Sequence, residues 1–139
     1  MAQFPMTDSR RRILEKIPDY AVDIEPANKT VKVTVGDQVI AESNNALLVR
    51  ETRHDDVYYL PRSDVDLASL TATEHSTYCP FKGHASYWSL PGDPERENFV
   101  WSYEDPYPEV SELKDYLSFY TDKTEINVGA GDEVRTRDN

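Results

Sequence analysis

The amino-acid sequence predicts a mainly β domain of the α+β class, made of small antiparallel sheets that are curled or folded over, with one main helix near the C-terminus. Short apolar runs at close spacing, separated by turn residues, are typical of such sheets. The clearest run is residues 31–35, in which valines alternate with Lys32 and Thr34 and leave one face of the strand apolar. Helical spacing of apolar residues is convincing only in residues 108–120.

At the N-terminal end, residues 9–17 predict either a short amphipathic helix or a frayed leader. The helix is favoured by Ile13, Leu14 and Ile17, which fall on one side, and by Ser9 as a cap. Strands are then expected, in chain order, at residues 20–26, 31–35, 39–41, 46–49, 57–60, 85–90, 98–103 and 125–128.

Turn-forming residues separate these strands. Gly36 followed by Asp37 predicts a hairpin between the strands on either side, and residues 91–94 predict a second, aromatic-rich hairpin. Residues 63–70 predict one helical turn after the strand that ends at Pro61.

The main helix is expected at residues 108–120. Pro108 suits the first turn, and acidic residues there favour the positive end of the helix dipole. The residues expected to pack on the sheet are Val110, Leu113, Leu117 and Tyr120.

The length of 139 residues predicts one domain, at residues 19–128, with a polar leader at 1–18 and a polar tail at 129–139. The net charge of −11 argues against nucleic acid as a partner. No apolar run approaches the ~20 residues of a membrane helix, and the start of the chain lacks the features of a secretory signal. One cysteine and no Cys-x-x-Cys pair predict a cytoplasmic protein without a metal or other cofactor.

Reactive and turn-forming residues are densest in residues 77–88. Cys79 is the one cysteine, and the cationic Lys82 and His84 follow it closely. A nearby positive charge increases the thiolate fraction of a thiol and therefore its reactivity. A small buried hydrophobe is the alternative role for Cys79. The turn predicted at Pro80 and Gly83 favours a position at the rim of a site.

Other candidate site residues are charged or aromatic. Glu51 and Asp64 could act as paired acids, Arg62 or Lys82 could hold an anion, and aromatic side chains could form the wall of a pocket. The predicted ligand-binding residues are Glu51, Tyr59, Arg62, Asp64, Lys82, Tyr87, Trp101 and Tyr103, and the candidate catalytic residues are Cys79 and Lys82.

Five segments in this order and spacing resemble the DUF427 domain family, over roughly residues 31–128. They are residues 31–43, 58–65, 79–88, 101–106 and 116–120. The resemblance implies a small, mostly β fold similar to the β-tent group, which includes methionine sulfoxide reductase B and zinc-binding relatives. The cysteine pairs of those zinc sites are absent here. The family has no established function. Some of its members are labelled nucleotidyltransferases, but the Gly-Ser turn beside metal-binding carboxylates that this chemistry needs does not occur in this sequence.

Three functions remain open from the sequence. The first is a small-molecule-binding module that holds a small polar or anionic molecule in an aromatic-lined pocket near Cys79. The second is an enzyme that uses Cys79 as a nucleophile or redox thiol, with Lys82 or His84 tuning its reactivity. The third is a protein-interaction module, including a homodimer formed through an edge strand or the aromatic hairpin.

Overall fold

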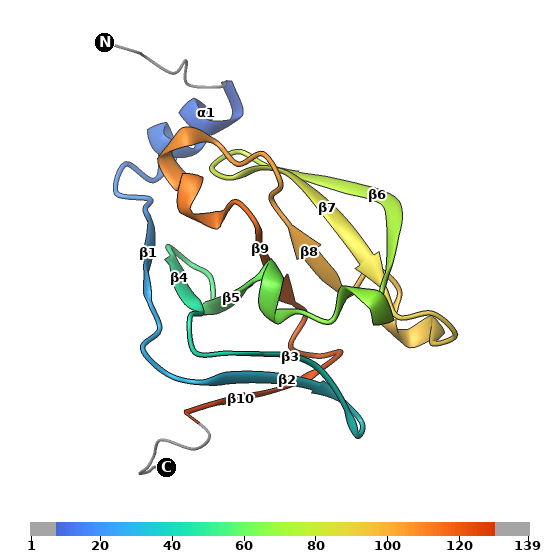
Figure 1. Cartoon of the computed structure of the whole chain (residues 1–139). Helices are drawn as coiled ribbons and strands as arrows, with labels where there is room; N and C mark the ends of the chain where they lie inside the picture. Colours follow the sequence, from blue (N-terminus) through green and yellow to red (C-terminus); the bar gives the residue numbers. More distant parts are fainter. Residues whose placement is uncertain (1–7, 130–139) are drawn as a thin grey trace.

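The computed structural model describes residues 8–129 and is mainly β (Figure 1). Within this range the strands are β1 (Val22–Pro26), β2 (Val31–Val35), β3 (Gln38–Ser43), β4 (Leu47–Glu51), β5 (Val57–Pro61), β6 (Thr71–Cys79), β7 (Gly83–Ser89), β8 (Val100–Ser102), β9 (Tyr116–Phe119) and β10 (Glu125–Val128). The helical elements are α1 (Asp8–Lys16) and the short 3₁₀ segments η1 (Arg62–Asp64), η2 (Leu67–Ser69), η3 (Pro94–Arg96) and η4 (Pro108–Leu113).

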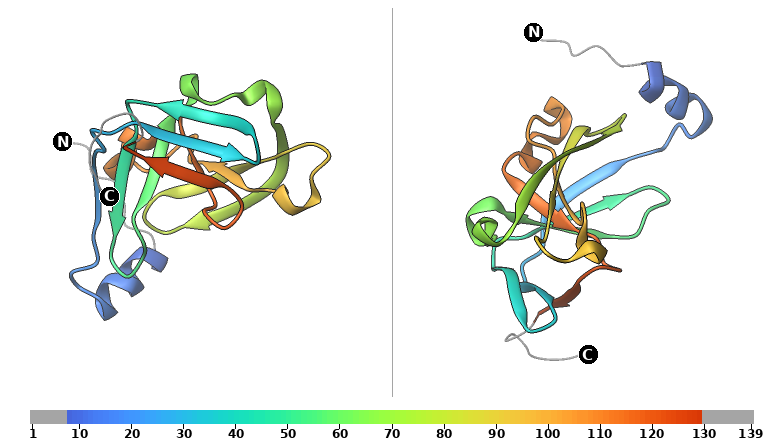
Figure 2. Two further views of the ribbon diagram at one scale, coloured as in Figure 1. Left: turned by 90° about the horizontal axis from the view of Figure 1, so that it is seen from below. Right: turned by 90° about the vertical axis from the view of Figure 1, so that its right-hand side faces the viewer.

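The strands form two antiparallel sheets, which confirms the predicted class. The larger sheet has the order β1-β4-β5-β9-β8-β7-β6, and the smaller has the order β10-β2-β3. Figures 1 and 2 show the small sheet lying across one side of the large one. The predicted hairpin after Gly36 is β2–β3, and the aromatic-rich hairpin is β7–β8, in which Tyr87 pairs with Trp101.

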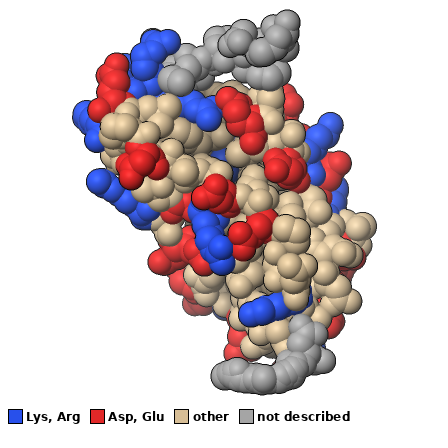
Figure 3. All heavy atoms as spheres, turned by 90° about the vertical axis from the view of Figure 1, so that its left-hand side faces the viewer, with Lys and Arg blue, Asp and Glu red and all other residues tan. Residues whose placement is uncertain are grey.

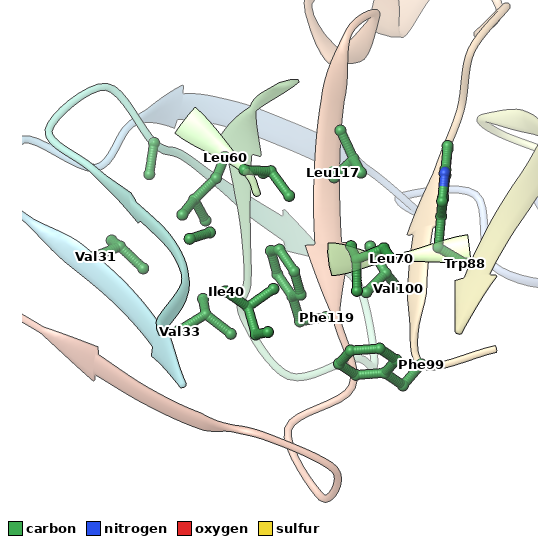
Figure 4. Close-up of a cluster of buried hydrophobic side chains, with 13 residues drawn as sticks. Val31, Val33, Ile40, Leu60, Leu70, Trp88, Phe99, Val100, Leu117 and Phe119 are labelled. Carbon is green, nitrogen blue, oxygen red and sulfur yellow. The ribbon is translucent and has the colours of Figure 1, made fainter. Parts of the chain in front are cut away.

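The main core lies between the two sheets (Figure 4). Val31 and Val33, two of the valines whose alternation predicted β2, are fully buried in it. Phe99 and Phe119 are the largest aliphatic or phenyl side chains of this core that are fully or almost fully buried. Because adjacent residues of a strand point to opposite faces, this core takes only alternate residues of the large sheet.

The opposite face of the large sheet carries a second buried cluster. Val49, Tyr59, Ala85, Tyr87, Tyr103, Val110 and Leu113 form it. In Figure 1, α1 and the orange segment η4 lie at the same end of the molecule, and an ion pair of 2.9 Å joins Arg10 of α1 to Glu109 of η4. The second face is therefore only partly covered by helical segments.

The prediction of a helix at residues 108–120 is wrong. A 3₁₀ segment ends at Leu113, Asp115 adopts a left-handed conformation with φ of 66°, and the next four residues form strand β9. β9 hydrogen-bonds to β5 on one side and β8 on the other. The helix that the structure does contain is α1, which is short and N-terminal, and it corresponds to the helical alternative for residues 9–17.

Two other segments differ from the sequence expectation. The nine residues of β6 form a strand at one edge of the large sheet that no alternation indicated, since eight of them are polar or small. In place of one helical turn at residues 63–70, the chain forms the two 3₁₀ segments η1 and η2, and Val65 and Leu70, which follow them, are buried. The leader before residue 8 and the tail after Gly129 lie outside the described residues. Within the part of the chain that is described, no helix is long and apolar enough to cross a membrane.

Candidate functional site

The second face of the large sheet carries a row of aromatic side chains. Tyr59 of β5, Trp101 of β8 and Tyr87 of β7 share this face, while their neighbours in sequence point into the main core. Trp101 pairs with Ser118 of β9, whose small side chain is buried and donates a 2.7 Å hydrogen bond to the Tyr58 carbonyl. The small residue in the row leaves room for the rings beside it.

A cleft of about 430 Å³ opens over this row. Its walls come from β4, β5, β7 and β8, from the turn between β6 and β7, and from Ile13 of α1. Tyr103 and Tyr20 add two more phenol rings. The cleft is thus mostly aromatic, with a few ionisable groups at its floor and mouth, which is the usual make-up of a ligand site.

The β6–β7 turn brings Lys82 to the cleft. Cys79 and Gly83 pair at the end of the hairpin, and the Lys82 amide donates to the Cys79 carbonyl at 3.3 Å. The Lys82 carbonyl in turn accepts a 3.0 Å hydrogen bond from the Tyr107 amide. Both bonds fix the backbone on either side of the lysine side chain, so its direction is set by the fold.

Gly83→Ala is expected to lower the free energy of unfolding by about 2 kcal/mol. Gly83 has φ of +114°, a conformation that an L-amino acid adopts only with strain, whereas the nearest atom to an added Cβ, the Asp105 carbonyl oxygen, is at an ordinary 3.5 Å. Urea denaturation measures the loss. The control is Gly36→Ala, at φ of +60° with open space around it, which should lose only about 1 kcal/mol. Equal losses would contradict the assigned strain.

A buried ion pair forms the floor of the cleft. Lys82 Nζ bonds to Glu51 Oε1, and the two side chains are only 7% and 11% exposed. The Tyr20 hydroxyl donates to the other carboxylate oxygen, Oε2, and His54 Nε2 lies 3.7 Å from the same oxygen. Glu51 therefore compensates the charge of Lys82 inside the cleft.

Cys79 lines the same cleft and is half-buried. Its Sγ atom is 3.8 Å from Lys82 Nζ, close enough for the ammonium group to donate to it. The Lys82 ammonium also lies 5.9 Å from the centre of the Tyr103 ring. One lysine thus contacts a carboxylate, a thiol and an aromatic ring.

Four phenol groups of the cleft, those of Tyr20, Tyr59, Tyr103 and Tyr120, have a raised pKa. Burial raises the pKa of Tyr59 and of Tyr103 far above the ordinary value. Burial, followed by the hydrogen bond to Glu51, does the same to the pKa of Tyr20. At the mouth, burial and then Tyr87 raise the pKa of Tyr120 to about 12. These hydroxyls remain protonated hydrogen-bonding groups across the physiological pH range.

Stability is expected to fall as the pH rises above about 10. Tyrosines of the unfolded chain lose their protons near that pH, whereas Tyr59 and Tyr103 of the folded protein keep theirs. The folded state then binds more protons than the unfolded state, so raising the pH favours unfolding. The contribution of these two tyrosines to stability is therefore fully present below about pH 10 and is lost above it. Melting temperatures between about pH 8 and about pH 11 test this. The double variant with Tyr59→Phe and Tyr103→Phe should show a shallower decline, and an equally steep one would contradict the assignment.

The structure brings together most, but not all, of the residues predicted from the sequence. Cys79, Glu51, Tyr59, Lys82, Tyr87, Trp101 and Tyr103 all line the cleft. Arg62 lies elsewhere, over the Trp88 ring and 3.4 Å from Glu104. Asp64 also lies elsewhere, where it accepts a 2.5 Å hydrogen bond from Ser43. The two acids, Glu51 and Asp64, therefore do not form a pair.

Sequence reasoning missed several residues of the cleft. The sequence indicates Tyr20 only as part of a strand, and Ile13 only as part of a leader or helix. Phe81 stacks on Tyr20 with ring centres 4.5 Å apart, which closes one wall. His54 and Asp55 come from the β4–β5 turn, and their position three and four residues after Glu51 is the one local signal that could have indicated them.

The charged surface around this end of the molecule is mixed in sign. On the face that carries α1, β1 and β4, Figure 3 shows basic side chains interspersed with acidic ones. Arg50, for example, forms ion pairs with Glu25 at 2.9 Å and with Asp56 at 3.5 Å. Among residues 8–129, no group of three or more His, Cys, Asp or Glu side chains is arranged to hold a metal ion.

Comparison with known families gives one match. The family model described as a domain of unknown function (DUF427) matches residues 23–129, which include every strand of both sheets except the first residue of β1. No curated protein matches the chain significantly. The residues of α1 and Tyr20, which contribute to the cleft, precede the matched region.

Proposed function

The chain belongs to the DUF427 family, which does not define an activity, and from the site itself we propose that it is a small-molecule-binding module whose ligand occupies the aromatic cleft. The observation that supports this most strongly is the row of Tyr59, Trp101 and Tyr87 that lines a 430 Å³ hollow together with the ion pair of Lys82 and Glu51. Apolar walls with a few fixed polar groups provide both affinity and orientation for a small ligand.

The expected ligand is polar, and the ion pair of Lys82 and Glu51 determines which ligand charge the cleft can accept. Lys82 could hold an anion only by sharing its charge with Glu51, which already bonds to it. An anionic ligand would also approach a second carboxylate at the cleft, that of Asp55. Of the two classes predicted from the sequence, a polar molecule without net negative charge is therefore favoured over an anion.

A thermal-shift screen with nucleotides, amino acids, amines, sugars and carboxylates tests the proposal. At least one class is expected to raise the melting temperature, because a ligand that binds only the folded state stabilises it. The shift should be reduced in Trp101→Leu, which removes part of the wall. It should remain in Tyr116→Leu, which makes a comparable change outside the cleft. No shift with any class would overturn the proposal.

A cysteine-dependent enzyme is the second candidate, favoured by the 3.8 Å distance between Lys82 Nζ and Cys79 Sγ. An ammonium group at this distance promotes the thiolate, which is the nucleophilic form. The alkylation rate of Cys79 with iodoacetamide at neutral pH should then fall about tenfold in Lys82→Met, given a folded variant. An unchanged rate would remove the chemical basis of this candidate without affecting the binding proposal.

A further inference from the structure

A second hollow of about 470 Å³ adjoins the cleft. The two share five lining residues, namely His54, Asp55, Val57, Trp101 and Tyr120. The second hollow continues toward apolar side chains of β9 and β10, including Phe119 and Ile126. A ligand could therefore extend from the floor of the cleft, across this junction, to an apolar end.

Aromatic rings form one side of the junction. The rings of Trp101 and Tyr120 lie with their centres 4.8 Å apart at an angle of 47°. Trp101 Nε1 donates a 3.1 Å hydrogen bond to the Tyr59 hydroxyl, and the Tyr59 ring meets the indole edge-on. This bond orients the indole ring before any ligand arrives, and a ring face attracts positive charge.

A carboxylate without an ion-pair partner among the described residues also lines the junction. The carboxylates that line the two hollows are Glu51, Asp55 and Asp56, and the ammonium group is Lys82. Glu51 pairs with Lys82, and Asp56 pairs with Arg50. For Asp55, no ion pair or side-chain hydrogen bond is found among residues 8–129. A carboxylate that no described cation neutralises thus lines the same junction as the ring pair.

From this geometry we propose that the junction binds an organic ammonium ion, either a protonated amine or a quaternary ammonium group. The cationic head would lie between Asp55 and the rings of Trp101 and Tyr120, with the rest of the ligand in one or both hollows. Ring faces and a carboxylate both attract a cation, and the net charge of −11 favours its approach. The inference rests on the proposed function and specifies the class of ligand.

Comparing the binding of choline with that of its uncharged isostere, neohexyl alcohol, distinguishes the effect of the ligand's charge from the effect of its shape. They have nearly the same size, but a carbon atom replaces the ammonium nitrogen in the alcohol. We expect choline to quench Trp101 fluorescence and to bind about tenfold more tightly than the alcohol. Equal binding of the two would overturn the cation inference and leave the binding function intact. Failure of choline to bind would also overturn it, whereas the proposed function is judged by the separate ligand screen.

Two variants with the same change in net charge test the role of Asp55. In Asp55→Asn, choline should bind several-fold more weakly, while the affinity for the alcohol should not change. Asp37→Asn is the control, because Asp37 lies in the β2–β3 turn and lines neither hollow. If both substitutions weakened choline binding equally, the affinity for choline would depend only on the net charge of the protein, which would contradict a site at the junction.

Discussion

Lys82→Met is expected to destabilise the folded protein by about 3–5 kcal/mol. The substitution keeps the length and packing of the side chain but leaves the Glu51 carboxylate, which is 11% exposed, without its cation. Desolvation of that charge is then compensated only by the Tyr20 hydroxyl and the more distant His54. Urea denaturation followed by circular dichroism measures the loss.

A double-mutant cycle distinguishes loss of the ion pair from loss of packing. Adding Glu51→Gln removes the orphaned charge, so the double variant should be more stable than the sum of the two single effects by about 2 kcal/mol. Arg62→Met is the matched control, because its ion pair with Glu104 is exposed and should contribute less than about 1 kcal/mol. Simple additivity at Lys82 and Glu51 would show that the pair does not act as a unit.

Phe99→Ala is expected to cost about 3–5 kcal/mol. Phe99 is fully buried and belongs to the core cluster between the two sheets that Figure 4 shows. Its removal leaves a cavity that the β-sheets on both sides cannot close without losing their register. The free energy of unfolding from urea denaturation is the measurement.

Two further variants are controls for the Phe99→Ala substitution. Phe99→Leu retains most of the buried volume and should lose clearly less stability than the alanine variant. Val39→Ala changes an exposed position of β3 and should stay within about 0.5 kcal/mol of wild type. A loss at Phe99 as small as that at Val39 would contradict the placement of the main core.

The false helix at residues 108–120 shows why periodicity alone was insufficient. Val110, Leu113, Leu117 and Tyr120 have helical spacing, but Leu117 and Phe119 also have the period of a strand. β9 lies between β5 and β8, and both neighbours use its backbone hydrogen-bonding groups. Pairing on both sides is a long-range effect that a short apolar run does not reveal. The β6 strand was missed for a related reason, since as an edge strand it carries mostly polar residues.

The sequence predicted most of the residues that form the candidate site, but it did not predict how these residues are arranged. The grouping of Cys79 with Lys82 is local, because a hairpin turn places them three residues apart. The partner of Lys82 is 31 residues away, and no spacing in the sequence indicates that Glu51, and not Asp64, reaches it. Tyr20 and Ile13 join the site from a segment before the matched family region.

The sequence by itself determined the β class, the main hairpins and the aromatic and ionisable residues available near Cys79. Turn residues and alternation act over a few positions, so they can be read directly from the chain. The tertiary structure alone decided which face of the large sheet the aromatic row occupies, which carboxylate neutralises Lys82, and that Asp55 lines the same junction as Trp101 and Tyr120. Those outcomes depend on the order of the strands and on contacts between distant segments, which local preferences do not specify.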